Sequence, residues 1–171
     1  KNSIDFYAVG NIYRALGYSN WSDLKGAEKE VDNIKDIIKN VDILMNESAA
    51  EKKLFELSKS GELRNYNIIH FATHALTLPE MPQASSIILS SSKGEFDGFL
   101  TPEEISQLEL KADFVNLSAC ETAMGRIYES EGIVSFAHSF FEAGANGVLM
   151  SLWKVDDNST SIFMSSFYSH Y

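Results

Sequence analysis

The chain has 171 residues, 44% of them hydrophobic and 22% charged, which is typical of one globular domain. Asp and Glu number 24 against 14 Lys and Arg, so the formal net charge is -10, and no run of basic residues stands out. The sequence therefore shows no basic patch of the kind that binds nucleic acid. An acidic balance mildly favours basic partners, but it is more often a property of a soluble surface.

The number of cysteines and the hydropathy of the sequence further limit the class of protein. Cys120 is the only cysteine, which excludes an intramolecular disulfide and a cysteine-rich metal site. A lone cysteine fits a reducing compartment, and we expect a cytoplasmic protein. The most apolar window, residues 133–153, contains Glu142, Asn146 and two glycines, so it predicts a helix, a turn and a buried strand instead of a membrane span. The chain opens on Lys1 and not on Met, so we expect a piece of a longer protein.

Hydrophobic spacing in the first half predicts helices and strands in alternation. "GAEKEVDNIKDIIKN" is predicted to be a helix with Val31, Ile34, Ile37 and Ile38 on one face, and "VDILM" after it a short strand. "AAEKKLFELSKSG" predicts a second helix, with Gly61 in the position of a C-cap. "YNIIHFA" is apolar at both parities, which is typical of a buried parallel strand, and "SSIILS" is interpreted as another.

The second half continues the alternation. In "LTPEEISQL", Thr101 stands at an N-cap position and Pro102 at the first helical position. "ADFVNLSA" predicts a strand that ends at Cys120, "EGIVSFAHSFFEAGA" a helix, "GVLMSLW" a strand and "DDNSTSIFMSSFYSHY" a final helix. His138, beside Phe140 in the first of these helices, is expected to pack in the core. This order predicts an α/β domain with a mainly parallel sheet and helices on both faces.

The two histidines of "NIIHFATHA" differ in their expected place on the sheet. His70 falls inside the strand run, where we expect it to be structural, enclosed and hydrogen-bonded. His74 is expected just past the strand's end, where sites form in open parallel sheets, and Cys120 also falls just past a strand. A cysteine attacks carbonyl groups as a thiolate, which a neighbouring imidazole generates near neutral pH. On the residues alone, a buried structural cysteine is the commoner alternative.

Four segments, in this order and spacing, resemble CHAT domains: "IIHFATHA", "GFLTPEEI", "FVNLSACETAMG" and "EGIVSFAHSFFEAGANGVLMSLWKVDD". CHAT domains are caspase-like cysteine peptidase domains of the clan that also holds separases and metacaspases. The resemblance runs from about Gly26 to the end of the chain. It implies a caspase-like three-layer α/β/α sandwich with a mainly parallel central sheet. It also implies a cysteine endopeptidase with His74 as base and Cys120 as nucleophile, working without a cofactor or a metal.

The resemblance also suggests how the domain is delimited and what it contacts. Residues 1–25 are expected to be a lead-in segment or the truncated start of the domain, and residues 26–171 the peptidase domain, truncated at its C-terminus. The expected partners are a protein substrate and either tetratricopeptide repeats or another chain of the same parent protein, with no nucleic acid and no membrane. A catalytically silent interaction or regulatory module is the alternative. A nucleotide-binding domain fails because no phosphate loop is present.

Backbone amides are expected to complete the catalytic centre. Those of Ala75 and Cys120 are the predicted donors of an oxyanion hole. Caspase-like sites often carry glycine where this chain has Ala75, a difference of small consequence unless the position needs a positive φ. Glu121 and Thr122 are weaker candidates for shaping the site or orienting His74.

The segment "SLWKVDD" resembles the strand and loop that line the substrate cleft in this clan. Trp153 is expected to form a pocket wall, and Asp156 or Asp157 to meet a basic side chain of the substrate. The alternative for the two aspartates is capping of the final helix, because carboxylates are favourable at a helix N-terminus.

Overall fold

A computed structural model describes residues 24–78, 81–92, 96–121, 130–151 and 157–171. Nearly all of the expected lead-in segment lies outside these residues. The helices and strands follow in the order α2 (Lys25–Ile37), α3 (Glu51–Ser60), β1 (Ile68–Leu76), β2 (Ser86–Ile88), β3 (Phe99–Leu100), α4 (Pro102–Ser106), β4 (Phe114–Glu121), α5 (Ser130–Ala143), β5 (Val148–Met150) and α6 (Asp157–His170). Short 3-10 turns occupy Asn46–Ser48, Glu62–Asn65 and Pro82–Ala84.

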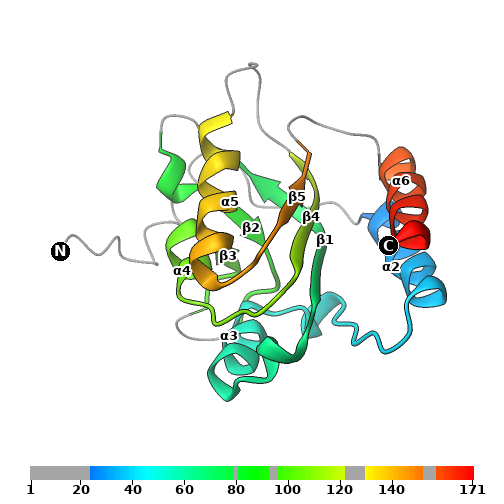
Figure 1. Cartoon of the computed structure of the whole chain (residues 1–171). Helices are drawn as coiled ribbons and strands as arrows, with labels where there is room; N and C mark the ends of the chain where they lie inside the picture. The colour runs from blue at the N-terminus through cyan, green and yellow to red at the C-terminus, as the bar shows by residue number, and fades with distance from the viewer. Residues whose placement is uncertain (1–23, 79–80, 93–95, 122–129, 152–156) are drawn as a thin grey trace.

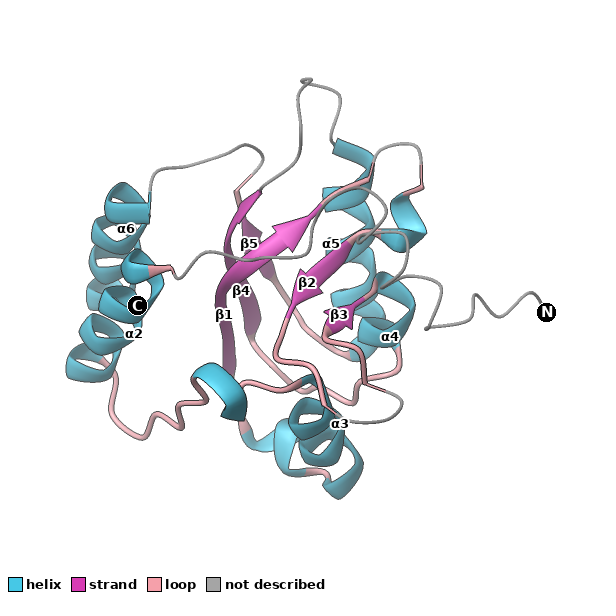
Figure 2. Cartoon of the chain, turned by 180° about the vertical axis from the view of Figure 1, so that it is seen from behind, coloured by secondary structure: helices cyan, strands magenta, loops and turns pink. Residues whose placement is uncertain are grey.

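The strands form one sheet in the order β3-β2-β1-β4-β5. β1, β4 and β5 are parallel neighbours, whereas β2 runs antiparallel to both β1 and β3. Helices α2 and α6 cover one face of the sheet, and α4 and α5 cover the other (Figure 1; Figure 2 from behind). The expected three-layer α/β/α architecture with a mainly parallel sheet is therefore confirmed.

Each helical layer buries its own face of the sheet. On the α5 side, the fully buried rings of Phe136 and Phe140 belong to the main core, and Phe140 lies 5.8 Å from Phe71 of β1, centroid to centroid. On the α6 side, a smaller cluster is built around Ile34, Met164 and Tyr168. Because side chains alternate along a strand, the odd-numbered positions of β1 and β4 face α5 and the even-numbered positions face α2 and α6.

The predicted helix ends are confirmed. Gly61 follows α3 with φ of +80°, the left-handed conformation of a C-cap. Thr101 caps α4, because its Oγ1 accepts the Glu104 N–H at 3.4 Å while Glu104 Oε2 accepts the Thr101 N–H at 2.8 Å. Pro102 occupies the first turn, as expected.

Two strand predictions were wrong. Residues 41–45 form no strand, and Leu44 is 41% exposed. β2 is antiparallel to β1, with Ala75 opposite Ile87. Its direction follows from the connection, because residues 77–85 are fewer than the dozen or so that a parallel crossover needs. The two-residue β3, which pairs with β2, was not predicted.

The expectation that His138 packs in the core was also wrong. Its side chain is 72% exposed and lies 3.6 Å from Glu142 of the same helix. Phe136 and Phe140 are four residues apart and share the face of α5 that meets the sheet. Position 138 lies half a helical turn from both, so it faces outward.

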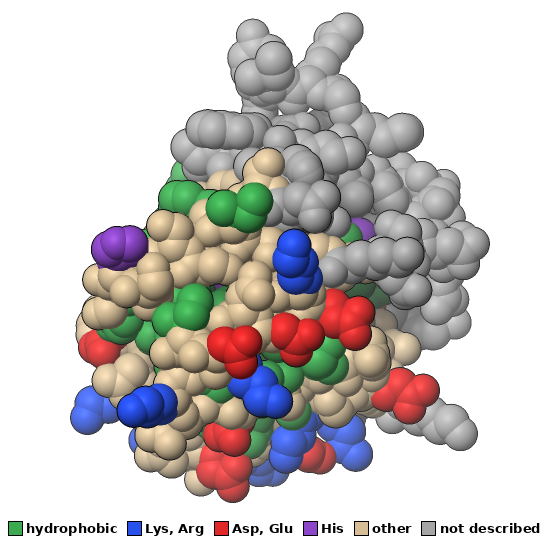
Figure 3. Space-filling view, turned by 90° about the vertical axis from the view of Figure 1, so that its right-hand side faces the viewer, with side chains coloured by type: hydrophobic (Ala, Val, Ile, Leu, Met, Phe, Trp, Pro, Cys, Tyr) green, Lys and Arg blue, Asp and Glu red, His purple; other side chains and the backbone are tan. Residues whose placement is uncertain are grey.

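Figure 3 looks onto the side of the molecule formed by α2 and α6. Hydrophobic side chains lie there among acidic and basic ones, and Ile162 and Phe163 of α6 are exposed. Among the described residues, no helix combines the length and the hydropathy needed to cross a membrane.

Candidate active site

The two expected catalytic residues stand on neighbouring strands. The parallel register of β1 and β4 makes the Cα atoms of His74 and Cys120 direct partners. Neighbouring strands lie about 4.8 Å apart, so these positions are adjacent across the sheet. β1 ends at Leu76 and β4 at Glu121, so both positions are close to the carboxyl ends of their strands. Ligands bind at that edge in sheets of this kind.

His74 lies inside β1 and Cys120 inside β4, not beyond the ends of these strands, so this part of the expectation was wrong. β1 continues past His74 because β2 pairs with Ala75 and Leu76. His74 is consequently buried, with 7% of its surface exposed. It shares the even-numbered face of β1 with His70, four residues earlier.

Ala75, a predicted oxyanion donor, is buried between two neighbouring strands. It is the register partner of Glu121 in β4 and of Ile87 in β2. Among the described residues, only Asn40 and Asn46 combine a positive φ with a side chain, so Ala75 has no need of the glycine found elsewhere at such positions. The Ala75 N–H can donate to an oxyanion only if it is not already hydrogen-bonded to β2 or to β4.

The remaining expected site residues fall where little or nothing is described. Thr122, Trp153 and Asp156 lie outside the described residues. Asp157 is the first residue of α6 and Glu121 the last of β4, and their side chains, like that of Cys120, are not described. The substrate cleft and the capping alternative therefore stay predictions.

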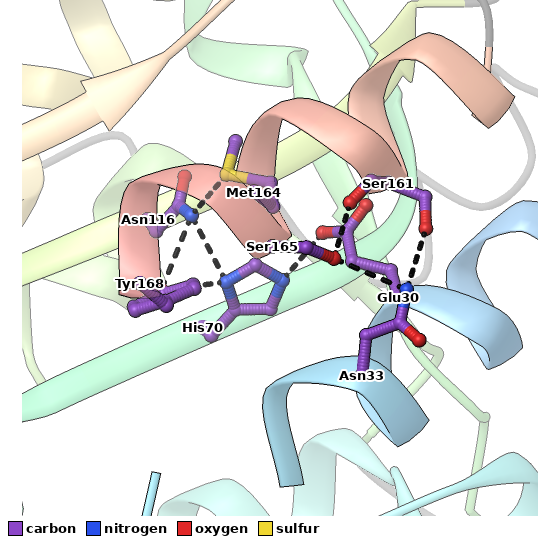
Figure 4. Close-up of polar contacts among 8 residues, drawn as sticks. All are labelled: Glu30, Asn33, His70, Asn116, Ser161, Met164, Ser165 and Tyr168. Atoms are coloured by element: carbon purple, nitrogen blue, oxygen red, sulfur yellow. Dashed lines mark hydrogen bonds and ion pairs between the residues drawn. The ribbon is translucent and has the colours of Figure 1, made fainter. Parts of the chain in front are cut away.

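A buried polar cluster surrounds His70 (Figure 4). His70 Nε2 lies 2.8 Å from Glu30 Oε1, and His70 Nδ1 lies 2.9 Å from the Tyr168 hydroxyl and 3.0 Å from Asn116 Nδ2. Glu30, Asn116 and Tyr168 are all buried. The expectation that His70 is enclosed and hydrogen-bonded is confirmed.

The partners of His70 were not among the predicted site residues, although two signals in the sequence pointed to them. Glu30 lies four residues before Ile34, on the face of α2 that carries the apolar stripe. Asn116 interrupts the apolar run of β4. A polar residue at a buried position requires a hydrogen-bond partner, but the sequence does not say which.

The cluster connects β1 and β4 with both helices of the α2–α6 layer. Asn116 Nδ2 also lies 3.0 Å from Met164 Sδ and 3.2 Å from the Tyr168 hydroxyl of α6. Between the helices, Asn33 Nδ2 donates to Ser165 Oγ at 3.1 Å. Burial raises the pKa of Tyr168 to about 12, so its hydroxyl keeps its proton at neutral pH.

A pair of buried carboxyl groups lies elsewhere in the fold, at the N-termini of α3 and α4. Glu51 is fully buried, and its Oε2 accepts the Gly98 N–H at 2.7 Å. Burial and, next to it, the charge of Glu104 raise the pKa of Glu51 to about 8. Gly98 has φ of +90°, and a Cβ there would collide with the carbonyl oxygen of Leu89, so a glycine is needed for this approach.

The sequence is similar to a known domain family and to two known proteins. The family model of the CHAT domain matches residues 13–171. Tetratricopeptide repeat protein 28 of Mus musculus is 36% identical over 70 residues, which cover 41% of this chain and 3% of that protein. The human protein of the same name is 23% identical over 181 aligned positions, covering 87% of this chain and 7% of that protein. The chain thus spans a small part of the length of these relatives. No solved structure matches it.

Proposed function

The chain belongs to the CHAT domain family, and from that premise we propose that it is a cysteine endopeptidase domain with Cys120 as nucleophile and His74 as base. The observation that supports this most is the register that makes His74 and Cys120 partners at the carboxyl edge of two parallel strands. A thiol and an imidazole on adjacent strands are the two groups that acyl transfer requires. The caspase-like architecture agrees with this assignment.

The reaction would run as two acyl transfers. His74 takes the thiol proton, and the Cys120 thiolate attacks the carbonyl carbon of the scissile bond. When the C–N bond breaks, His74 returns the proton to the leaving amine and a thioester remains. Water then attacks the thioester, His74 accepts a proton from it, and the C–S bond breaks to release the acid. No cofactor takes part.

Because His74 is buried, its electrostatic interactions with the reacting groups should be stronger than those of an exposed side chain. A site from which water is largely excluded strengthens the electrostatic interactions of the reacting groups. The backbone N–H groups of Ala75 and Cys120 are the proposed oxyanion donors.

The substrate and the setting of the domain are part of the proposal. Trp153, Asp156 and Asp157 would accept a basic side chain at the residue before the cut, which agrees with the acidic balance of the chain. The matched relatives are named as tetratricopeptide repeat proteins, which supports a parent protein that contains such repeats. A thiol nucleophile fits a reducing compartment, and we place the protein in the cytoplasm.

A library of peptides from a digested proteome tests the proposal. Wild-type protein should cleave a subset of the peptides, and Cys120→Ala should lower cleavage by about 10³-fold or more. Ser118→Ala, two residues earlier in β4 and opposite Ala72, is the matched control and should retain cleavage. Circular dichroism and thermal melting establish that the variants are folded.

Unchanged cleavage by Cys120→Ala would refute the enzyme assignment. A folded wild-type protein that cleaves no peptide in the library would favour the alternative, a catalytically silent interaction or regulatory module.

A further inference from the structure

His70 and Asn116 link β1 to β4 four residues before the proposed catalytic pair. They are Cα partners in the same ladder that pairs His74 with Cys120, four residues further along each strand. Their side chains meet as well, since Asn116 Nδ2 lies 3.0 Å from His70 Nδ1 (Figure 4). Asn116 is fully buried, so water does not compete for this contact.

The two ring nitrogens of His70 meet different partners. Nδ1 lies 3.0 Å from Asn116 Nδ2, and a ring proton on Nε2 lets Nδ1 accept there. From Nε2 the ring donates to Glu30 Oε1 at 2.8 Å. The two edges of His70 therefore serve different neighbours: the Nδ1 edge meets β4 and α6, and the Nε2 edge meets α2.

A hydrogen bond between two fixed positions specifies strand register more strictly than apolar contacts do. The neighbouring pairs in this ladder, Ile68 with Phe114 and Phe71 with Leu117, are apolar and contribute no side-chain hydrogen bond that would specify the register. A slide by two residues keeps every side chain on its face and displaces position 120 by about 6.6 Å along the strand. That displacement exceeds the reach of proton transfer, about 2.6–3.2 Å between heavy atoms.

We propose that His70 and Asn116 are positioning residues that hold β1 against β4 and thereby set His74 against Cys120. The inference rests on the proposed function, because it concerns the same dyad. His70 lies four residues before His74 on β1 and Asn116 four residues before Cys120 on β4, so each acts through the strand that carries a catalytic side chain. The proposal accounts for a buried polar pair where an apolar pair would avoid the loss of hydration.

Two substitutions of His70 separate the link to β4 from the link to α2. The amide of an asparagine lies near the place of His70 Nδ1 and can accept from Asn116, but it does not reach Glu30. The amide of a glutamine reaches the place of Nε2, toward Glu30, and leaves Asn116 without its acceptor on β1. Both remove the ring, so the loss of packing is matched.

Alkylation by iodoacetamide measures the dyad directly, because Cys120 is the only cysteine of the chain and intact mass reports its modification. The rate as a function of pH gives the thiolate population. The alkylation rate of a free cysteine reaches half its maximum near pH 8.5. We expect the midpoint of His74→Ala to lie about there and the midpoint of the wild type to lie at a lower pH. His70→Gln and Asn116→Leu should move the profile toward that of His74→Ala and slow alkylation at pH 7 by about tenfold or more.

The controls distinguish positioning from general weakening of the fold. His70→Asn should recover most of the shift. Asn33→Ala, which removes the hydrogen bonds from α2 to Ser161 and Ser165 of α6, should lower the melting temperature without moving the profile. Wild-type profiles for His70→Gln and Asn116→Leu would overturn the positioning role and leave the dyad intact. A wild-type profile identical to that of His74→Ala would overturn the dyad and the positioning role with it.

Discussion

Replacing Glu51 with glutamine should change how the stability of the fold depends on pH. In the folded chain, burial and the charge of Glu104 raise the pKa of Glu51 from 4.5 to about 8. The folded state thus binds this proton more tightly than the unfolded state does. The stabilisation is fully present below pH 4.5 and is lost as the pH rises through the folded value, near 8.

The size of this effect follows from the pKa shift. Each pKa unit corresponds to about 1.4 kcal/mol, so a rise from 4.5 to about 8 amounts to about 5 kcal/mol for a group titrating alone. Glu104 titrates with Glu51, and burial raises its pKa as well, so the pair loses its protons in shared steps. We expect the pair to lower the unfolding free energy by about 3–5 kcal/mol between pH 5 and pH 8.

Urea denaturation at pH 5, 6, 7 and 8 measures this dependence. Glu51→Gln retains an acceptor for the Gly98 N–H and carries no charge, so its curve should be flatter. The variant should match the wild type near pH 5 and exceed its stability by about 2–4 kcal/mol at pH 8. Glu103→Gln removes a carboxylate from the exposed side of the same turn of α4 and should run parallel to the wild type. Parallel curves for Glu51→Gln as well would refute the reasoning.

The remaining predictions concern the backbone, the two histidines and the substrate. Gly144 has φ of +109°, and an added Cβ would collide with the carbonyl oxygen of Leu110. Gly144→Ala should therefore lower the unfolding free energy by about 1–3 kcal/mol, and an unchanged urea midpoint would contradict this. His70→Ala should lose about 1–3 kcal/mol of stability, because Glu30 is left without its partner, and an unchanged melting temperature would contradict this. His74→Ala should lose turnover by several orders of magnitude and, since His74 is buried, also lower the melting temperature, and retained turnover would show that the base is misassigned. In the peptide library, turnover should be highest after Lys or Arg, and a maximum after apolar or acidic residues would remove the proposed role of Asp156 and Asp157.

Local features of the fold were predictable because short-range chemistry determines them. Gly61 ends α3 through its left-handed conformation, and Thr101 begins α4 through a hydrogen bond within three residues. The adjacency of His74 and Cys120 was predictable for another reason, since the carboxyl ends of parallel strands meet at one edge.

Features that depend on distant partners were not predictable. The apolar pattern of β2 is the same in either direction, and only the short connection to β1 makes it antiparallel. The burial of His74 depends on β2 extending the ladder beyond the apolar run. Glu51 opens a helix, a place where carboxylates are usually exposed, and it is buried because Gly98 approaches it from a distant loop.

The most direct test of the dyad is the rate at which a peptidyl acyloxymethyl ketone with lysine next to the reactive carbon modifies Cys120. This electrophile occupies the substrate site, and intact mass shows the addition at the only thiol of the chain. We predict that the wild type reacts at least about 10²-fold faster than His74→Ala, the usual range for a positioned acid–base group. Equal rates for the two proteins, or a wild-type rate no higher than that of the chain unfolded in urea, would contradict the assignment of His74 and Cys120 as a catalytic pair.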